Sequence, residues 1–286
     1  MKLRSLLFVP GDSERKFAKA QACGADALIL DLEDSVAPQQ KTAARDHVAS
    51  LLGNAQPRGW SFFVRVNALD SELALDDLAA VVRPGLDGIL VPKANAAEDI
   101  VRFGHYLDAF ETKAGMGLGA VKVAVVATET ARAMFALQTY APAHPRLVAI
   151  TWGGEDLAAA LGATANRDEG GWTFPYRVAR AQCLFAAGAA GVTAIDTIHA
   201  DFRDAEGLER ECRRSRRDGF QGRMAIHPDQ VTTINGCYSP SEAEIAHARR
   251  IVEAFAADPG AGTLGIDGKM VDIPHLKVAQ KTLASI

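Results

Sequence analysis

Short apolar runs rich in β-branched residues recur along the chain and alternate with longer stretches that have helical spacing. Most of these short runs lack the in/out alternation of a half-exposed strand, which is typical of strands buried on both faces of a parallel sheet. We therefore predict eight β-strands, at residues 6–9, 27–32, 62–66, 88–91, 121–127, 147–152, 193–197 and 224–226.

The segments between these strands have apolar stripes typical of helices that pack on a sheet. Pro38 stands at a favourable helix start, and Ala44, Val48 and Leu51 continue an apolar face after it. Eight uninterrupted strand–helix repeats predict one closed (β/α)₈ barrel of the TIM type over residues 1–257. The main alternative is a doubly wound open sheet, but no GxGxxG motif follows the first strand.

The sequence changes character at residue 258. The stretch DPGAGTLGIDGKMVDIPHLKVAQKTL contains glycine-marked turns, a short hairpin through 265–271 and a final helix from Pro274. We expect residues 258–286 to form a C-terminal extension outside the barrel. It either covers an active site as a lid or closes the bottom of the barrel.

Composition and charge exclude several classes of protein. A hydrophobic content of 48% is that of a globular protein, and a net charge of −4 gives no basic field for nucleic acid. The four cysteines lie far apart without a CxxC pair, which indicates a reducing compartment. The N-terminal apolar run is shorter than a secretory signal, and no stretch approaches the ~18 apolar residues of a membrane span. We expect a cytoplasmic protein that binds neither membranes nor nucleic acid.

Polar residues follow most of the predicted strands at their carboxyl ends, where barrel enzymes place their chemistry. These residues are Glu33, Asp34, Arg65, Asn67, Lys93, Glu129, Asp156, Asp196, His199 and His227. Glu129 and Asp156 follow adjacent strands and suit Mg²⁺, which takes one or two carboxylates and keeps positions for water or substrate oxygens. The alternative is two solvated carboxylates that pair with cations such as Arg132. No HxH or HExxH motif indicates zinc.

Two sets of basic residues need an explanation. Arg65 lies within the apolar strand FFVRVN and requires a carboxylate partner, either a substrate or one of Glu33 and Asp34. Arg15 and Lys19 follow the Pro-Gly turn after the first strand, four residues apart on one helical face. They would hold phosphates there, or form an ordinary solvated face.

The arginine-rich run ERECRRSRRDGFQGR at 209–223 suggests a polyanion site at first sight. However, Glu206 and Arg210, and likewise Glu209 and Arg213, are four residues apart, which favours a solvent-exposed helix with ion pairs along its surface.

Nine motifs, in order and at plausible spacing, resemble the citrate lyase β-subunit-like family, which includes relatives of malyl-CoA and citramalyl-CoA lyases in the phosphoenolpyruvate/pyruvate-type barrel superfamily. They are RSLLFVPGDSERKFAKA (4–20), LILDLEDSVAP (28–38), FVRVN (63–67), ILVPKA (89–94), ATETARAM (127–134), WGGEDLAAALG (152–162), AIDTIHADFRD (194–204), GFQGRMAIHPDQV (219–231) and DGKMVDIPHLKVAQKTL (267–283). The resemblance covers nearly the whole chain.

The resemblance implies roles for the acidic residues and Arg65. Glu129 and Asp156 match the Mg²⁺ ligands of the family, and Arg65 matches the arginine that holds the carboxylate and carbonyl oxygen of a 2-oxo acid. Glu33 and Asp34 match acids that orient metal-bound water.

The resemblance also implies how coenzyme A and a partner subunit contribute. Arg15, Lys19 and Lys93 lie where related enzymes bind the CoA phosphates. Asp272, within KMVDIP, matches an acid/base aspartate that related enzymes supply from a neighbouring subunit's C-terminal lid. The extension would then pack on that neighbour, in a homotrimer or a multiple of it.

The implied activity is a Mg²⁺-dependent carbon–carbon lyase that cleaves or forms malyl-, citramalyl- or citryl-CoA, or a related 3-hydroxy-dicarboxyl-CoA thioester. One alternative is a citrate lyase β subunit that acts with α and acyl-carrier subunits on a carrier-bound thioester. A pyruvate-type aldolase that needs no CoA is another. A non-catalytic 2-oxo-acid-binding barrel is the third, and the intact set of Arg65, Glu129, Asp156 and Asp272 speaks against it.

Overall fold

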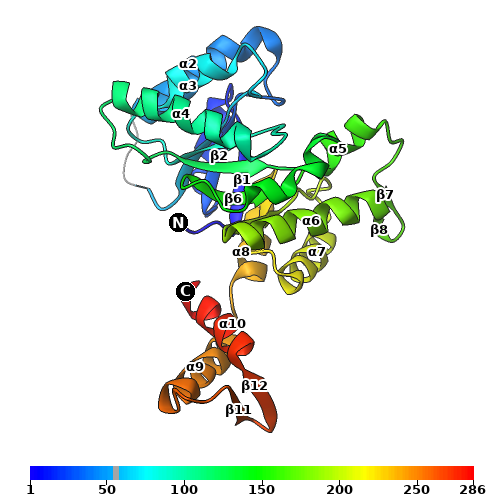
Figure 1. Ribbon diagram of the computed structural model, residues 1–286. Helices are drawn as coiled ribbons and strands as arrows, with labels where there is room; N and C mark the ends of the chain where they lie inside the picture. The colour runs from blue at the N-terminus through cyan, green and yellow to red at the C-terminus, as the bar shows by residue number, and fades with distance from the viewer. Residues whose placement is uncertain (54–57) are drawn as a thin grey trace.

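The computed structural model describes residues 1–53 and 58–286, and its centre is a closed barrel of eight parallel strands (Figure 1). Around the barrel the order is β1-β10-β9-β6-β5-β4-β3-β2. The strands are β1 (Ser5–Pro10), β2 (Ala27–Asp31), β3 (Ser61–Arg65), β4 (Gly88–Val91), β5 (Lys122–Val126), β6 (Leu147–Thr151), β9 (Thr193–Asp196) and β10 (Gly222–Ala225). This confirms the predicted (β/α)₈ barrel and its eight strands.

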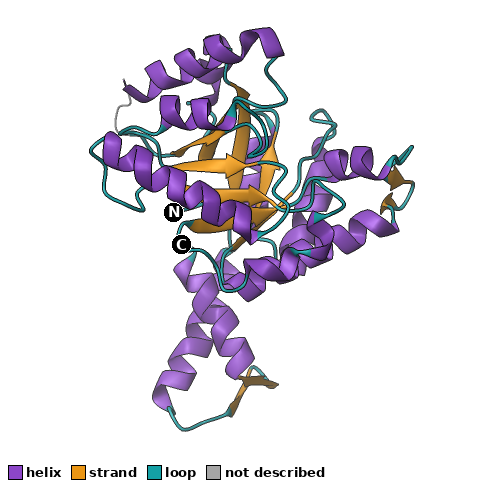
Figure 2. Ribbon diagram, turned by 45° about the horizontal axis from the view of Figure 1, so that its top comes forward, coloured by secondary structure: helices purple, strands orange, loops and turns teal. Residues whose placement is uncertain are grey.

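Helices surround the strands on the outside of the barrel (Figure 2). They are α1 (Glu14–Ala20), α2 (Lys41–Gly53), α3 (Ala74–Val81), α4 (Ala97–Lys113), α5 (Gly154–Leu161), α6 (Phe174–Ala190), α7 (Ala205–Asp218) and α8 (Gln230–Tyr238). Short 3₁₀ helices form at Pro38–Gln40, Ala133–Phe135 and Leu137–Tyr140, and the last two replace the helix expected between β5 and β6. A small antiparallel hairpin, β7 (Arg167–Asp168) and β8 (Gly171–Trp172), lies between α5 and α6 and was not predicted. Within the described ranges, no helix is both long and apolar enough to cross a bilayer.

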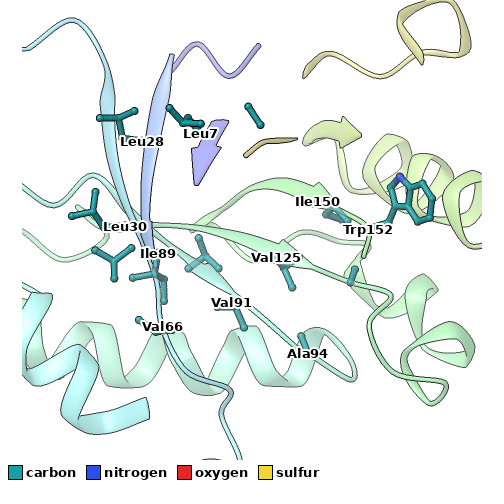
Figure 3. Close-up of a cluster of buried hydrophobic side chains, with 14 of the residues drawn as sticks. Leu7, Leu28, Leu30, Val66, Ile89, Val91, Ala94, Val125, Ile150 and Trp152 are labelled. Atoms are coloured by element: carbon teal, nitrogen blue, oxygen red, sulfur yellow. The ribbon is translucent and has the colours of Figure 1, made fainter. Parts of the chain in front are cut away.

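Two apolar layers hold the barrel together. Leu7, Leu28, Ile89, Val125 and Ile150 belong to the cluster between the strands and the helices (Figure 3). A second cluster takes residues from every barrel strand and fills the inside; its buried members on the strands are Leu6, Ala27, Ile29, Phe63, Leu90, Ala124, Val126, Ala149, Ile195 and Met224. Successive side chains on a strand face opposite sides, so the residues two positions beyond Ile29 and Phe63 also face the barrel axis.

The C-terminal part of the chain forms an arm that projects away from the barrel (Figures 1 and 2). It consists of α9 (Glu242–Ala257), the antiparallel hairpin β11 (Thr263–Ile266) and β12 (Lys269–Asp272), and α10 (Ile273–Ala284). The arm has a small core of its own, made of Ala248, Ile251, Phe255, Val271 and Ala279. The hairpin and the last helix lie where the sequence predicted them. The structure also places α9 in the arm, although the expected boundary at 258 assigns this helix to the barrel.

Candidate active site

A cavity of about 830 Å³ opens at the carboxyl ends of the barrel strands. Its volume is in the range of sites that enclose an organic ligand. Acidic and basic side chains from separate strand ends line it together with the first helix; the charged residues are Arg15, Lys16, Lys19, Asp31, Arg65, Glu129, Glu155, Asp156 and Asp229. The structure therefore brings Arg15, Lys19, Arg65, Glu129 and Asp156, five of the predicted site residues, to one cavity.

Arg65 is fixed at the base of this cavity by a buried aspartate. Asp31 and Arg65 stand in register on neighbouring strands, and both face the barrel axis. Arg65 Nε donates to Asp31 Oδ1 at 2.7 Å, and Nη2 donates to Oδ2 at 2.6 Å. Asp31 is 1% exposed and also accepts from the backbone amides of Glu33 and Ser35. Burial alone would raise the pKa of Asp31, but the hydrogen bonds and charge of Arg65 lower it.

The partner of Arg65 differs from the one expected. The sequence suggested Glu33 or Asp34, whereas Asp31 makes the bidentate contact and Glu33 takes the remaining nitrogen, with Nη1 and Oε2 3.0 Å apart. Asp34 lies at 4.0 Å from the same nitrogen. The signal available in the sequence was an acid, Asp31, at the end of an otherwise apolar strand; its pairing with Arg65 depends on the strand register, which only the structure gives.

Lys93 lies against the acidic residues of the site. Its Nζ contacts the carboxylate of Glu33 and lies 3.1 Å from Asp34 Oδ2 and 3.6 Å from Asp156 Oδ1. Its backbone is in the left-handed region, with φ of 51°, and its amide donates to Glu129 Oε2. A non-glycine residue with this φ is uncommon and is characteristic of functional sites. Lys93, expected with the phosphate-binding cations, thus has carboxylates as its described partners.

Glu129 faces the cavity but is buried, at 4% exposure. Burial, together with the negative charges of Asp156 and Glu33, raises its pKa to about 8, although the amide of Lys93 acts in the opposite direction. Gly153 makes space for this side chain, because a Cβ there would lie 2.8 Å from Glu129 Cγ. Asp156 lies in the first turn of α5, directly after this glycine segment.

The acidic side of the site has too few cations for its carboxyl groups. Five carboxyl groups (Asp31, Glu33, Asp34, Glu129 and Asp156) face two cations, Arg65 and Lys93. Among the described residues, no three His, Cys, Asp or Glu side chains surround one point in a way that suits a metal. A pair of carboxylates that leaves the other positions to water or substrate fits Mg²⁺, which rarely has an all-protein cage. Glu129 and Asp156 are the residues that would hold it.

The opposite side of the cavity is basic. Arg15, Lys16 and Lys19 of α1 line it, and within the described ranges none of them has an ion pair. The four-residue spacing of Arg15 and Lys19 indicated this side, but it gave no reason to include Lys16. His227 also lines the cavity and stacks on Phe202, with ring centroids 4.5 Å apart.

Asp272 does not reach the cavity of its own chain. It is the N-cap of α10, where its side chain accepts from the amide of His275, and no residue of the arm is among those that line the cavity. Its Oδ1 lies 2.5 Å from His275 Nδ1. The position of the arm leaves a contribution of Asp272 to a neighbouring subunit as a prediction.

The fold and the site together define a (β/α)₈-barrel protein with a carboxylate pair that would suit a divalent cation, a fixed arginine and a basic rim. The profile of the HpcH/HpaI aldolase/citrate lyase family matches residues 4–228. The chain belongs to this family.

Curated relatives and a solved structure agree with this assignment. A (3S)-malyl-CoA thioesterase of Cereibacter sphaeroides is 38% identical, with 98% of this chain and 93% of the relative covered. The citrate lyase subunit beta of Escherichia coli is 36% identical, with 98% and 92% covered. A crystal structure of the protein CitE from Mycobacterium tuberculosis, in complex with magnesium, acetoacetate and coenzyme A, superposes with a TM-score of 0.77. That chain is 34% identical, with 99% of this chain and 97% of CitE covered.

Proposed function

We propose that this protein is a Mg²⁺-dependent carbon–carbon lyase that cleaves or forms a 3-hydroxy-dicarboxyl-CoA thioester. Malyl-, citramalyl- and citryl-CoA are the substrates in this class, and the products of cleavage are an acetyl-CoA-type thioester and a 2-oxo acid. One observation carries the proposal: Glu129, Asp156 and Arg65 lie at the base of the same cavity whose rim carries Arg15 and Lys19. The relative that binds magnesium, acetoacetate and coenzyme A supports it.

Different charged residues bind different parts of the substrate in this proposal. Glu129 and Asp156 would hold Mg²⁺, which when bound acts as a Lewis acid on substrate oxygens. Arg65 holds the carboxylate of the 2-oxo acid and supplies a positive charge that Asp31 keeps in place. Glu33 and Asp34 orient water beside the metal.

The cations of the rim bind the other end of the substrate. Arg15 and Lys19, with Lys16 between them, bind the CoA phosphates. We leave Lys93 out of this set, because its ammonium group already contacts Glu33 and Asp34. Its charge holds these two acids in place beside the metal position.

Asp272 of a neighbouring subunit provides the acid/base group in this proposal. During cleavage its carboxylate takes the proton of the 3-hydroxyl group, and the electrons of the breaking carbon–carbon bond form the thioester enolate. The same proton then returns to the enolate carbon. Hydrogen bonding by His275 lowers the pKa of Asp272, so the carboxylate is in the basic form at neutral pH. Because the arm projects away from its own barrel, the proposal includes a homotrimer or a multiple of it.

Two relatives point to alternative outcomes at the same site. The relative named (3S)-malyl-CoA thioesterase favours hydrolysis of the thioester, with a free thiol and a free acid as products. The relative named citrate lyase subunit beta favours a carrier-bound thioester and the presence of α and acyl-carrier subunits.

A product analysis distinguishes these activities. The protein is incubated with Mg²⁺, acetyl- or propionyl-CoA, and glyoxylate, pyruvate or oxaloacetate, and the products are identified by mass spectrometry. A condensed thioester that disappears with EDTA and in Glu129→Ala supports the lyase, and appearance of free CoA and free acid supports the thioesterase. A condensation that proceeds without any CoA identifies the aldolase. Absence of product with every pair, in protein that binds Mg²⁺ and a 2-oxo acid, contradicts a stand-alone CoA lyase.

A further inference from the structure

A second, smaller cavity of about 150 Å³ lies on the flank of the barrel, between the β7–β8 hairpin and helices α6 and α7. None of its residues lines the central cavity; they are Gly170, Gly171, Trp172, Arg177, Arg180, Asp196, Glu211, Arg214 and Arg223. Four of the nine are arginines, from two helices and a strand. The proposed reaction gives these four arginines no role.

Two of these arginines have no counter-charge. Arg177 and Arg214 are exposed and make no hydrogen bond or ion pair with the described part of the chain. The carboxylates that face them are already engaged. Asp196 Oδ2 accepts from Arg180 Nη2 at 3.0 Å, and Glu211 Oε1 accepts from Arg167 at 2.6 Å.

The cavity therefore has an excess of positive charge. Arg167 and Asp218 lie at its edge, paired with Glu211 and Arg180 respectively. Including them, five arginines stand against three carboxylates, which leaves two positive charges without a partner. The acids at the turn of the hairpin, Asp168 and Glu169, do not line the cavity.

Arg223 provides an independent indication of a missing ligand. Its side chain lines the cavity but is only 1% exposed, and its Nε has no hydrogen-bond partner within the described residues. Nη2 donates to Glu211, while Nη1 lies 3.9 Å from Asp196 Oδ2. A buried charged group with an unsatisfied N–H is costly, because it has lost water without a replacement. An acceptor in the cavity would supply this partner.

We propose that this arginine cavity binds a small dianionic oxyanion, either inorganic phosphate or the terminal phosphoryl group of a larger ligand. Guanidinium groups match the geometry and charge of phosphate oxygens. A volume of about 150 Å³ is enough for a small tetrahedral anion. It is well below the roughly 300 Å³ minimum of a drug-sized ligand site.

Tryptophan residues between the two cavities allow anion binding to be followed by fluorescence. Trp172 lines the arginine cavity and packs on Trp152 at 4.8 Å, while Trp152 lines the central cavity. Trp152 Nε1 also donates to Asp196 Oδ1 at 2.6 Å. Two of the three tryptophans of the chain therefore lie at this wall. Binding of an anion is expected to change their fluorescence.

The test measures binding of inorganic phosphate to the full chain by calorimetry and tryptophan fluorescence, at constant ionic strength and without Mg²⁺ or substrate. Arg214→Gln and Arg177→Gln are each expected to weaken binding at least about tenfold, because each removes a charge-assisted hydrogen bond. The matched control is Arg213→Gln. Arg213 directly precedes Arg214 on α7, pairs with Glu209 and does not line the cavity. Its affinity for phosphate is expected to stay unchanged.

Absence of saturable phosphate binding to the unmodified protein would overturn the proposal, and so would equal losses in Arg214→Gln and Arg213→Gln. Competition identifies the source of the phosphoryl group. Displacement of phosphate by CoA but not by dephospho-CoA assigns the site to the 3′-phosphate of the nucleotide, and no displacement by either assigns it to the free anion. Each of these two results supports the site. The measurement needs no turnover, so it is independent of the proposed lyase activity.

Discussion

Magnesium binding is expected to release about one proton from this protein near neutral pH. In the metal-free protein the pKa of Glu129 is raised to about 8 by burial and by the charges of Asp156 and Glu33. A metal ion binds only the ionised carboxylate, so Mg²⁺ and the proton compete for the same group. The direction follows directly: the affinity for Mg²⁺ rises as the pH rises toward 8 and becomes nearly constant above it.

The size of the effect follows from the pKa. With a pKa of about 8, roughly one Glu129 in a hundred is ionised at pH 6 and about half are ionised at pH 8. The apparent affinity should therefore increase about fifty-fold between these two pH values, and only about two-fold more at higher pH. The raised pKa of Glu129 also makes the free energy of unfolding depend on pH. Because the pKa in the folded state exceeds the ordinary value of 4.5, the free energy of unfolding of the metal-free protein falls as the pH rises from 4.5 to about 8.

The assay is titration calorimetry with Mg²⁺ at four pH values from 6 to 9, in pairs of buffers with different ionisation enthalpies. The buffer pairs report the number of protons released. Asp156→Asn should weaken binding and move the midpoint of the pH dependence to lower pH, since one of the charges that raise the pKa of Glu129 is removed.

Proton release from another group in the cavity is the main competing explanation. His227 lines the same cavity, so His227→Gln is the matched control and should keep the full slope. An affinity that is constant between pH 6 and 8, or a slope that disappears in His227→Gln, would refute the assignment of the proton to Glu129.

Three further results are expected. Glu129→Ala and Asp156→Ala should each abolish Mg²⁺-dependent turnover while circular dichroism still reports the folded barrel; turnover that persists would remove that residue from the metal site. Asp272→Asn should lower kcat by roughly 10²–10⁴ without weakening CoA binding, and mixed oligomers with Glu129→Ala should regain activity if the aspartate acts on a neighbouring subunit. Arg65→Ala should lower the free energy of unfolding, measured in urea, by about 3–5 kcal/mol because it leaves Asp31 buried and unpaired; a loss below about 1 kcal/mol would contradict this.

The barrel strands could be predicted because burial on both faces gives each of them a continuous apolar run. The β7–β8 hairpin, with two residues in each strand, is too short for any periodicity to appear. The apolar stripe of helix α9 has the same spacing whether the helix packs on a barrel or on α10. Only the contacts of Ile251 and Phe255 with Val271 and Ala279 in one cluster assign it to the arm.

The site was predictable wherever position at a strand end decided it, as for Glu129 and Asp156. The hydrogen-bond and ion-pair partners of the site residues could not be predicted, because they depend on strand register and backbone angles. Asp31 was interpreted as part of an apolar strand, although its register places it opposite Arg65. The left-handed backbone at Lys93 cannot be inferred from the residue itself, and it directs the amide of Lys93 to Glu129.

The pairing of Arg65 also explains why an arginine so near the acidic residues does not replace a metal ion. Its charge is balanced by two hydrogen bonds to Asp31, and the ammonium group of Lys93 contacts Glu33. The charge of Arg65 and the backbone amide of Lys93 offset only part of the effect of burial, and the pKa of Glu129 stays raised. By contrast, the pKa of Asp31, which accepts two hydrogen bonds from Arg65, is lowered. The two acids therefore differ: Asp31 holds a fixed positive charge, whereas Glu129 keeps a raised pKa and, in the proposed function, would take a cation from solution.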